Sequence, residues 1–280
     1  MVIVESRHLL WNDRLIFFPS ETECGELVRD IPFRDIVRIQ YTPVRFDCDQ
    51  RALAHSQVMR TWCIDLTKDL DAIYGEMHKD ACRRRIKKAE KMLSSILIRR
   101  NDQISREDFF SLYNRFVTTK MHTKLLSRKR FEEYLGHAEV FAIYHDGRVV
   151  CANLTLPDTD RKRVFGAFSA SIRLNGGDDA MLASVLGRYL TWHEIRMFKA
   201  EGMEIYDFGG ISLGGPITQY KMSYGGFPLE EYCHVFAGGM IPRPVVNLGR
   251  RVYRMMASRY RGTAKRSLHV PPGRGERNTV

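Results

Sequence analysis

The stretch from Ile205 to Gly226 restricts what this chain can fold into more than any other segment. It reads Ile-Tyr-Asp-Phe-Gly-Gly-Ile-Ser-Leu-Gly-Gly-Pro-Ile-Thr-Gln-Tyr-Lys-Met-Ser-Tyr-Gly-Gly, so a β-type run is followed by six glycines and one lysine. The alternation over residues 203–208 predicts a buried strand. Gly209 and Gly210 at its end permit backbone conformations and close approaches that other residues resist. We therefore expect a ligand to pass near the backbone at the end of this strand.

A short helical turn is predicted over residues 218–223, after the glycine-rich loop. This turn would project Tyr220 and Lys221 beside the carboxyl end of the strand, and Gly225 and Gly226 would terminate it. Two interpretations stay open. Lys221 is a cation that faces a cleft, or the glycines only connect a strand to a turn and Lys221 is a solvated surface lysine. The first interpretation makes this segment the candidate site.

A second segment, residues 80–91, predicts a helix with a concentrated positive charge. It reads Asp-Ala-Cys-Arg-Arg-Arg-Ile-Lys-Lys-Ala-Glu-Lys, in which cations recur on successive turns while Ile86 and Ala89 can face inward. The cations on these turns are Arg83, Arg84, Lys87, Lys88 and Lys91. Such a helix is either a solvated charged face or a surface that binds phosphates.

The two segments together resemble a known family. The order Tyr-Asp-Phe-Gly-Gly (206–210), a short Gly/Pro loop, an aromatic followed by Lys (220–221) and an aromatic with Gly-Gly (224–226) resembles the second acyltransferase-like domain of the FemABX peptidyltransferases and their relatives among GNAT-fold N-acyltransferases. The pattern Arg-x-x-Ile-Lys-Lys-Ala-Glu-Lys (83–91) is similar to the segment that closes the first domain of FemABX-like proteins, where the basic residues face substrate phosphates. This resemblance implies substrate-binding roles for Arg83, Arg84, Lys87 and Lys88.

The same resemblance implies roles in the glycine-rich stretch. Lys221 matches the lysine that in this family contacts the reacting acyl group or the terminal phosphate of the tRNA, and a cation there suits stabilisation of a tetrahedral oxyanion. Tyr220 takes the place of the preceding aromatic and is expected to line the acyl channel. Tyr206 and Tyr224 are expected to bind substrate with it. Asp207 orients the site or assists proton removal, or it is a buried structural carboxylate that caps the glycine loop.

The fold class that we expect is α+β, with a GNAT-like mixed sheet and flanking helices. Residues 101–240 contain patterns for two helices, an antiparallel meander, a long helix and a strand, in the order of a GNAT-type domain. Residues 1–100 are short for a complete acyltransferase-like domain, so a reduced GNAT-like domain is expected there. A basic amphipathic helix is predicted over residues 241–261, and residues 262–280 are expected to be disordered.

The acyl donor depends on the loop that opens the long helix. In the acetyl-CoA enzymes of this fold, a loop of the form Arg/Gln-x-x-Gly-x-Gly/Ala leads into that helix, whose backbone N–H groups bind the pyrophosphate. Here Arg173-Leu-Asn-Gly176 matches the first half, but Asp178 stands where the small residue belongs and Asp179 follows it. Two carboxylates at this terminus would satisfy the N–H groups themselves and repel a pyrophosphate. FemABX proteins also lack a working CoA loop and take an aminoacyl ester on tRNA.

We therefore expect an aminoacyltransferase that moves an aminoacyl group from charged tRNA to an amine on a small molecule, peptide or cell-wall precursor, with no cofactor and no metal. Direct attack on the ester needs a deprotonated amine, reactants held together and a stabilised oxyanion, which proximity and electrostatics largely supply. One alternative is an N-acyltransferase that uses acyl-CoA or carrier-protein thioesters. Another is a non-catalytic module that binds tRNA or a membrane surface.

Net charge and cysteine usage limit the partners and the compartment. The 280 residues contain 44 Lys+Arg against 33 Asp+Glu, a net charge of +11, which favours polyanions such as nucleic acid, nucleotide-linked substrates or an anionic membrane face. The six cysteines contain no Cys-x-x-Cys pair, so neither a zinc site nor a disulfide framework is expected. Because no stretch approaches the ~20 apolar residues of a membrane helix, we expect a soluble, cytoplasmic protein.

Overall fold

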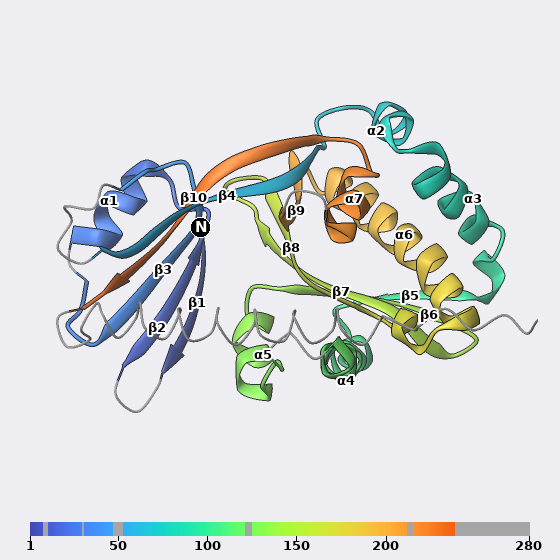
Figure 1. Cartoon of the computed structure of the whole chain (residues 1–280), viewed down its shortest axis with the longest axis horizontal. Coiled ribbons are helices and arrows are strands. Elements are labelled where there is room, and N and C mark those ends of the chain that lie inside the picture. Colours follow the sequence, from blue (N-terminus) through green and yellow to red (C-terminus); the bar gives the residue numbers. More distant parts are fainter. Residues whose placement is uncertain (8–10, 30, 47–52, 121–124, 212–214, 239–280) are drawn as a thin grey trace, which may run out of the picture.

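Ten strands form one mixed sheet with helices on both faces (Figure 1). The strand order is β1-β2-β3-β10-β4-β9-β8-β7-β6-β5. This computed structural model describes residues 1–7, 11–29, 31–46, 53–120, 125–211 and 215–238. The α+β class, with a mixed sheet and flanking helices, is confirmed. The helix predicted over residues 241–261 and the tail over 262–280 lie outside the described residues.

The amino-terminal part of the sheet begins with β1, along which buried residues alternate with more exposed ones. Its elements are β1 (Val2–Arg7), β2 (Asn12–Phe17), α1 (Glu21–Arg29), β3 (Asp35–Thr42) and β4 (Leu53–Asp65). The last strand, β10 (Phe227–Ala237), lies between β3 and β4 and pairs antiparallel with both. The two ends of the described chain therefore share one piece of sheet.

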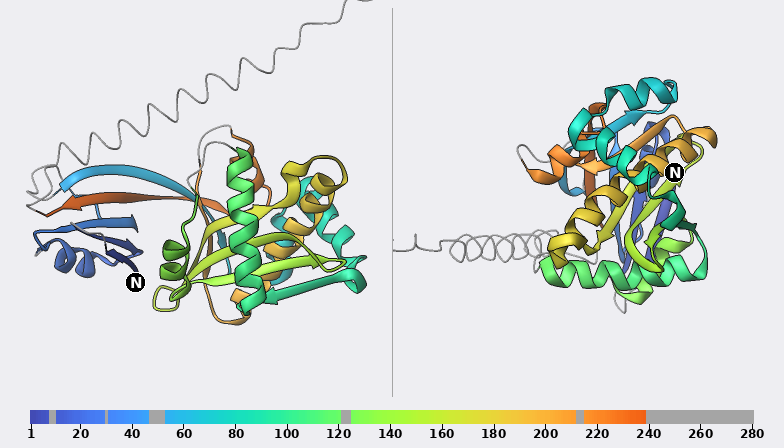
Figure 2. Two further views of the ribbon diagram at one scale, coloured as in Figure 1. Left: turned by 90° about the horizontal axis from the view of Figure 1, so that it is seen from below. Right: turned by 90° about the vertical axis from the view of Figure 1, so that its right-hand side faces the viewer.

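The second part of the sheet contains the predicted meander, and the predicted long helix follows the meander in the chain. Its strands are β5 (Ile96–Arg100), β6 (Glu139–His145), β7 (Arg148–Asp158), β8 (Arg163–Ser171) and β9 (Ile205–Gly210). Asp146 and Gly147 form the turn of the β6–β7 hairpin, and both have positive φ angles, 51° and 74°. In Figure 2, α6 (Gly177–Ala200) covers one face of these strands, while α4 (Gln103–Lys120) and α5 (Arg128–Leu135) lie on the other. Short helices complete the connections: α2 (Leu70–Glu76), η2 (Leu93–Ser95), η3 (Ile172–Asn175) and α7 (Pro216–Met222).

The sheet runs without a break through both predicted domains. β5, at the end of the predicted amino-terminal domain, pairs with β6 of the second domain. Conversely, β10 of the second domain pairs with β3 and β4 of the first. The predicted boundary near residue 100 therefore lies within a continuous sheet, and an independent domain on either side of it stays a prediction.

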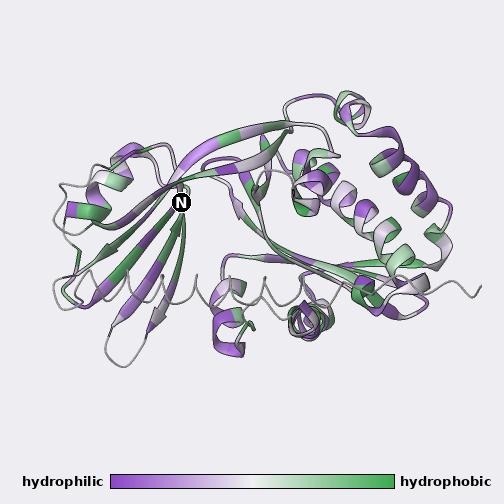
Figure 3. Ribbon diagram, in the orientation of Figure 1, coloured by the Kyte–Doolittle hydropathy of each residue, from purple (hydrophilic) through white to green (hydrophobic). Residues whose placement is uncertain are grey.

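The basic segment folds as a π-helical turn followed by an α-helix rather than as one uniform helix. The turn is Lys79–Arg83, and α3 (Arg84–Glu90) continues it. His78 caps the start, because its Nδ1 accepts hydrogen bonds from the backbone N–H groups of Asp80 and Ala81. α3 packs against α6, and its ribbon is largely hydrophilic in Figure 3.

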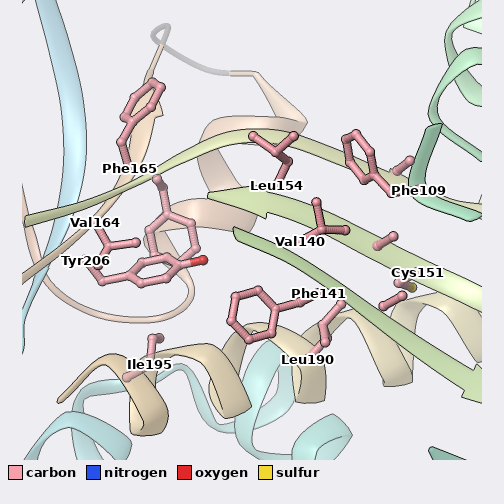
Figure 4. Close-up of a cluster of buried hydrophobic side chains, with 14 of the residues drawn as sticks. Phe109, Val140, Phe141, Cys151, Leu154, Val164, Phe165, Leu190, Ile195 and Tyr206 are labelled. Atoms are coloured by element: carbon pink, nitrogen blue, oxygen red, sulfur yellow. The ribbon is translucent and has the colours of Figure 1, made fainter. Parts of the chain in front are cut away.

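The main hydrophobic core lies between α6 and the sheet and continues under α4 (Figure 4). Phe141 of β6 lies above Leu190 and Ile195 of α6, and Phe109 of α4 packs on the opposite face. All four side chains are fully buried. Burying a side chain of this size stabilises the fold by about 1.5–3 kcal/mol, so this core fixes α6 against the strands that precede the candidate site.

β8 and β9 are parallel but pair over only a short stretch. The register joins residues 163–165 of β8 to residues 205–207 of β9, and the described strands have no paired residues beyond these. Gly209 has a φ of +75°, and a Cβ at this position would lie 3.0 Å from the Phe165 ring. Glycine is therefore required beside the Phe165 ring. The ladder with β8 ends at Asp207, while Gly210 at the end of β9 pairs with β4 and presents its carbonyl to Lys221 of α7.

Candidate active site

Lys221 lies on α7, directly beyond the end of β9. Pro216 begins this helix, where its missing N–H costs no helical hydrogen bond. The Nζ of Lys221 donates to the backbone carbonyl of Gly210 at 2.6 Å. The side chain is half-buried, and burial lowers the pKa of Lys221 to about 8, although the nearby Asp207 carboxylate favours the charged form. Lys221 is thus held against the glycines of β9 and is not a solvated surface lysine.

Asp207 is a fully buried carboxylate with an arginine partner. Its Oδ2 accepts from Nη2 of Arg163 at 2.5 Å, and its Oδ1 accepts from the backbone N–H of Gly209 at 2.7 Å. Burial raises the pKa of Asp207, and the Arg163 guanidinium opposes this effect. Arg163 also binds both carboxylate oxygens of Glu231, at 2.7 Å each. These contacts match the structural carboxylate that caps the glycine loop, and a part for Asp207 in proton transfer stays a prediction.

Tyr220 and Tyr224 lie together at the end of α7. Their hydroxyl oxygens are 2.9 Å apart, within hydrogen-bond distance. The guanidinium carbon of Arg188, from α6, lies 4.0 Å from the ring centroid of Tyr220 and 4.9 Å from that of Tyr224. Tyr224 is fully buried, whereas Tyr220 is only partly buried. Of the two predicted substrate contacts, only Tyr220 therefore presents appreciable surface to a ligand.

Tyr206 is buried on β9 and points into the core (Figure 4). Its hydroxyl donates to Oε2 of Glu194 at 2.5 Å, and the side-chain amide of Asn153 donates to Oε1 of the same carboxylate at 2.7 Å. Glu194 is fully buried, and this burial raises its pKa to about 7. The Tyr206 hydroxyl thus binds an internal carboxylate within the core, and its contact with substrate stays a prediction.

The sequence reasoning missed three polar residues on the buried face of α6. Arg188, Thr191 and Glu194 follow one another at intervals of three residues, and all three are buried. This spacing places them along one side of a helix. Polar residues at helical spacing on an otherwise apolar face are the sequence signal that could have identified them, because a buried polar group needs partners.

The cations of the basic segment are arranged around the outside of α3. Arg84, Lys87 and Lys88 are exposed, and Arg83 is half-buried. Arg84 forms an exposed ion pair with Asp80 at 2.9 Å. In the part of the chain that the structure describes, Lys87 and Lys88 form no ion pair. Their charges are therefore available to an anionic partner, and the predicted phosphate contacts stay predictions.

The start of α6 differs from the sequence expectation. Gly176 occupies the N-cap position with a φ of +81°, and no side chain caps the helix. Asp178 is exposed, while Asp179 accepts hydrogen bonds from Nη2 of Arg148 and from the side-chain amide of Asn175, both at 2.6 Å. The prediction that the two carboxylates satisfy the helix N–H groups is therefore wrong, because Asp179 turns to Arg148 and Asn175.

A cleft of about 350 Å³ lies between α3, the start of α6 and the turn that joins β6 to β7. Its lining includes the charged or titratable residues Lys88, His145, Arg148, Asp178 and Asp179 and the apolar residues Met92, Met181, Leu182 and Val185. Cations, carboxylates and apolar side chains therefore meet at this end of α6. Among the described residues, no group of three or more His, Cys, Asp or Glu side chains could hold a metal ion. The same part of the chain contains no helix of the length and hydropathy needed to cross a membrane.

Comparisons with known proteins cover most of these elements. A family described as acetyltransferase (GNAT) domain matches residues 77–222, just over half of the chain. The structure of FemX matches with a TM-score of 0.58 at 11% identity, over 88% of this chain and 85% of its own. The carboxyl-terminal domain of a putative lysylphosphatidylglycerol synthetase from Agrobacterium fabrum gives a TM-score of 0.52 at 12% identity, over 85% and 86% of the two chains. No curated protein sequence matches the chain.

The matched region begins just before the basic segment and ends just after Lys221. It therefore includes α3, the meander, α6 and α7, and the predicted GNAT-like fold is confirmed. At these low identities the solved structures show similarity of fold and not of activity. The chain belongs to the acetyltransferase (GNAT) domain family, and it is an acyltransferase whose fold resembles that of FemX.

Proposed function

We propose that this acyltransferase moves an aminoacyl group from charged tRNA to an amine-bearing acceptor. The main support is the exposed cationic face of α3, where Arg84, Lys87 and Lys88 point away from the core. A basic helical face of this kind suits binding to nucleic-acid phosphates. The FemABX-like motifs and the structural neighbours, FemX and a putative lysylphosphatidylglycerol synthetase, support the same class of donor.

Lys221 suits the transfer step. The acceptor nitrogen attacks the ester carbonyl, the C–N bond forms, the ester C–O bond breaks, and the amine proton ends on the ribose oxygen. Negative charge develops on the carbonyl oxygen, and a nearby ammonium stabilises it. Loss of one such stabilising group costs about 10²–10³-fold in kcat. Lys221 is half-buried against the end of β9, so water screens its charge less than at an open surface.

A second candidate donor is an acyl-CoA or carrier-protein thioester. The start of α6 has no side-chain cap, and Arg148 offsets the charge of Asp179. Uncapped backbone N–H groups at a helix start attract phosphate groups. Lys88, in the adjacent cleft, adds a further positive charge. The loop sequence argues against a thioester donor, whereas these structural observations favour one.

Labelled donors separate the two candidates. The protein is mixed with a pool of amines and either aminoacyl-tRNAs that carry radiolabelled amino acids or radiolabelled acyl-CoAs, with Lys221→Ala as the control. We expect labelled amide only from aminoacyl-tRNA. Turnover with acyl-CoA alone contradicts the proposed donor and supports the second candidate. Absence of turnover with either donor supports a non-catalytic module that binds tRNA or a membrane surface.

A further inference from the structure

Arg188 is a buried cation on α6. Only 5% of its surface is exposed. Among the described residues, no carboxylate pairs with its guanidinium, and its Nε has no hydrogen-bond partner. Burying a charge without an opposite charge is costly. The charge of Arg188 is therefore stabilised by the carbonyl and the aromatic rings that its guanidinium contacts.

The contacts of Arg188 with α7 fall on the turn that contains Lys221. Its Nη1 donates to the carbonyl of Tyr220 at 3.0 Å and to the Oγ of Ser223. That Oγ in turn donates to the same Tyr220 carbonyl at 2.6 Å. The guanidinium also lies over the rings of Tyr220 and Tyr224. Tyr220 and Ser223 stand on either side of Lys221, so Arg188 clamps the backbone from which the lysine projects.

The opposite side of this clamp is the start of the basic segment. The Arg188 guanidinium lies close enough to Cys82 to favour its thiolate, although burial raises the pKa of Cys82 to about 11. The backbone N–H of His78 donates to the carbonyl of Ser223 at 2.8 Å. Arg188 therefore lies where α6, α7 and the start of the basic segment meet.

We propose that Arg188 is a positioning residue for acyl transfer, which holds the end of α7 so that Lys221 keeps its place against Gly210. This inference rests on the role proposed above for Lys221. A neutral side chain could fill the same space, but it could not donate to the Tyr220 carbonyl and stack on two rings at once. The planar guanidinium does both, whereas the ammonium of lysine keeps the charge and can donate but has no plane to stack on the rings.

Three variants isolate this clamp. Arg188→Met removes the charge and the hydrogen bonds but keeps an unbranched side chain, and replacing a buried ion by an apolar residue is often neutral or stabilising. Arg188→Lys keeps a charged donor but removes the planar group. Arg196→Met is the matched control, because Arg196 also lies on α6, stacks over Trp192 at 5.7 Å and has a buried, unpartnered Nε among the described residues. Circular dichroism and thermal unfolding confirm that each variant folds.

The first readout needs no acyl donor. Each variant is acetylated with trace acetic anhydride over a range of pH, and peptide mass spectrometry follows Lys221. In the wild type and in Arg196→Met the labelling midpoint is expected near the pKa of about 8. In Arg188→Met we expect the midpoint to move upward, because a released α7 lets water reach the lysine, and Arg188→Lys should lie between the two. An unmoved midpoint in folded Arg188→Met overturns the proposal.

The second readout is a double-mutant cycle with whichever donor the wild type uses. Arg188→Met is expected to lower kcat about 10–100-fold with little change in KM. In the Lys221→Ala background it should cost no more than about twofold, because the residue through which it acts is gone. Equal losses in both backgrounds overturn the proposal. Failure of the wild type with charged tRNA contradicts only the proposed donor, since the labelling experiment still decides the role of Arg188.

Discussion

The buried amine of Lys221 gives the protein a pH dependence that reports its role. Burial lowers the pKa of Lys221 to about 8, so the cation prevails below that pH and the neutral amine above it. A cation that stabilises an oxyanion is lost as pH rises through this value. We therefore expect kcat/KM of the wild type to fall as pH rises above about 8, measured with a single donor and acceptor across the range.

Lys221→Arg is the control for this prediction, because a guanidinium stays charged throughout the range. Its activity should be reduced and should lack the fall near pH 8. A wild-type rate that rises through the same pH, while Lys221→Arg shows no change, contradicts charge stabilisation. If Lys221→Ala kept full turnover and Asp207→Asn were folded but inactive, the mechanism would depend on proton transfer and not on charge stabilisation by Lys221.

Glu194 supports a prediction about stability. Burial raises its pKa from the ordinary 4.5 to about 7. Between these values the folded state binds more protons than the unfolded state, so this group makes the free energy of unfolding fall as pH rises. Glu194→Gln should therefore raise the free energy of unfolding by about 1–3 kcal/mol near pH 8. Near pH 5 the difference should be small. Urea unfolding at both pH values measures it, and a variant that is less stable near pH 8 contradicts the prediction.

At the scale of the element, the cations of α3 act together. Replacing Lys87 and Lys88 by Gln removes two exposed charges. If both contact phosphates, the slope of log affinity for tRNA against log salt concentration should flatten by about 0.7–0.9 per contact. Filter binding at several salt concentrations measures this slope. The control is Lys162→Gln, which removes an exposed charge paired with Glu204 at 2.6 Å. Equal slopes for wild type and the α3 variant would show that the helix is a solvated face.

Most elements could be predicted from sequence because their patterns are local. The β6–β7 hairpin, the long helix α6 and strand β9 have strong periodicity and turn residues, and the structure has all three. The π-helical start of the basic segment depends on the His78 cap, which periodicity does not reveal. The position of β10 between β3 and β4 is set by packing between distant segments, so no local pattern specifies it.

The candidate site was predicted only in part, because some of its residues depend on partners from distant segments. A sequence motif was enough to select Lys221 and Tyr220 as candidates, and the structure places both on α7. Arg188 and Glu194 were missed because a polar residue on an apolar helix face acquires a role only through its partners on other elements. Those partners are the Tyr220 carbonyl on α7 for Arg188 and the Tyr206 hydroxyl on β9 for Glu194.

At the scale of the whole molecule, one buried ion-pair network links three strands. Arg163 of β8 binds Asp207 of β9 at 2.5 Å and Glu231 of β10 at 2.7 Å. Arg163→Ala leaves two buried carboxylates without their cation, and breaking a buried pair in this way costs about 3–5 kcal/mol. We expect the midpoint of urea unfolding, followed by circular dichroism, to fall accordingly.

The matched control for that prediction is Arg60→Ala. Arg60 of β4 pairs with Glu230 of β10 at 2.8 Å, but both side chains are about half exposed, at 59% and 49%. Losing an exposed pair costs only about 0–1 kcal/mol. An equally small loss in Arg163→Ala would contradict the view that the buried network holds β10 in the sheet.

Single-turnover transfer tests most directly whether Lys221 promotes acyl transfer from charged tRNA. Wild type or Lys221→Ala, in excess over aminoacyl-tRNA with a radiolabelled amino acid, is mixed with saturating acceptor, and the labelled amide is followed with time. We expect the transfer rate constant of Lys221→Ala to be about 10²–10³-fold lower, with unchanged circular dichroism and tRNA affinity. Equal rate constants for the two proteins would contradict the role of Lys221.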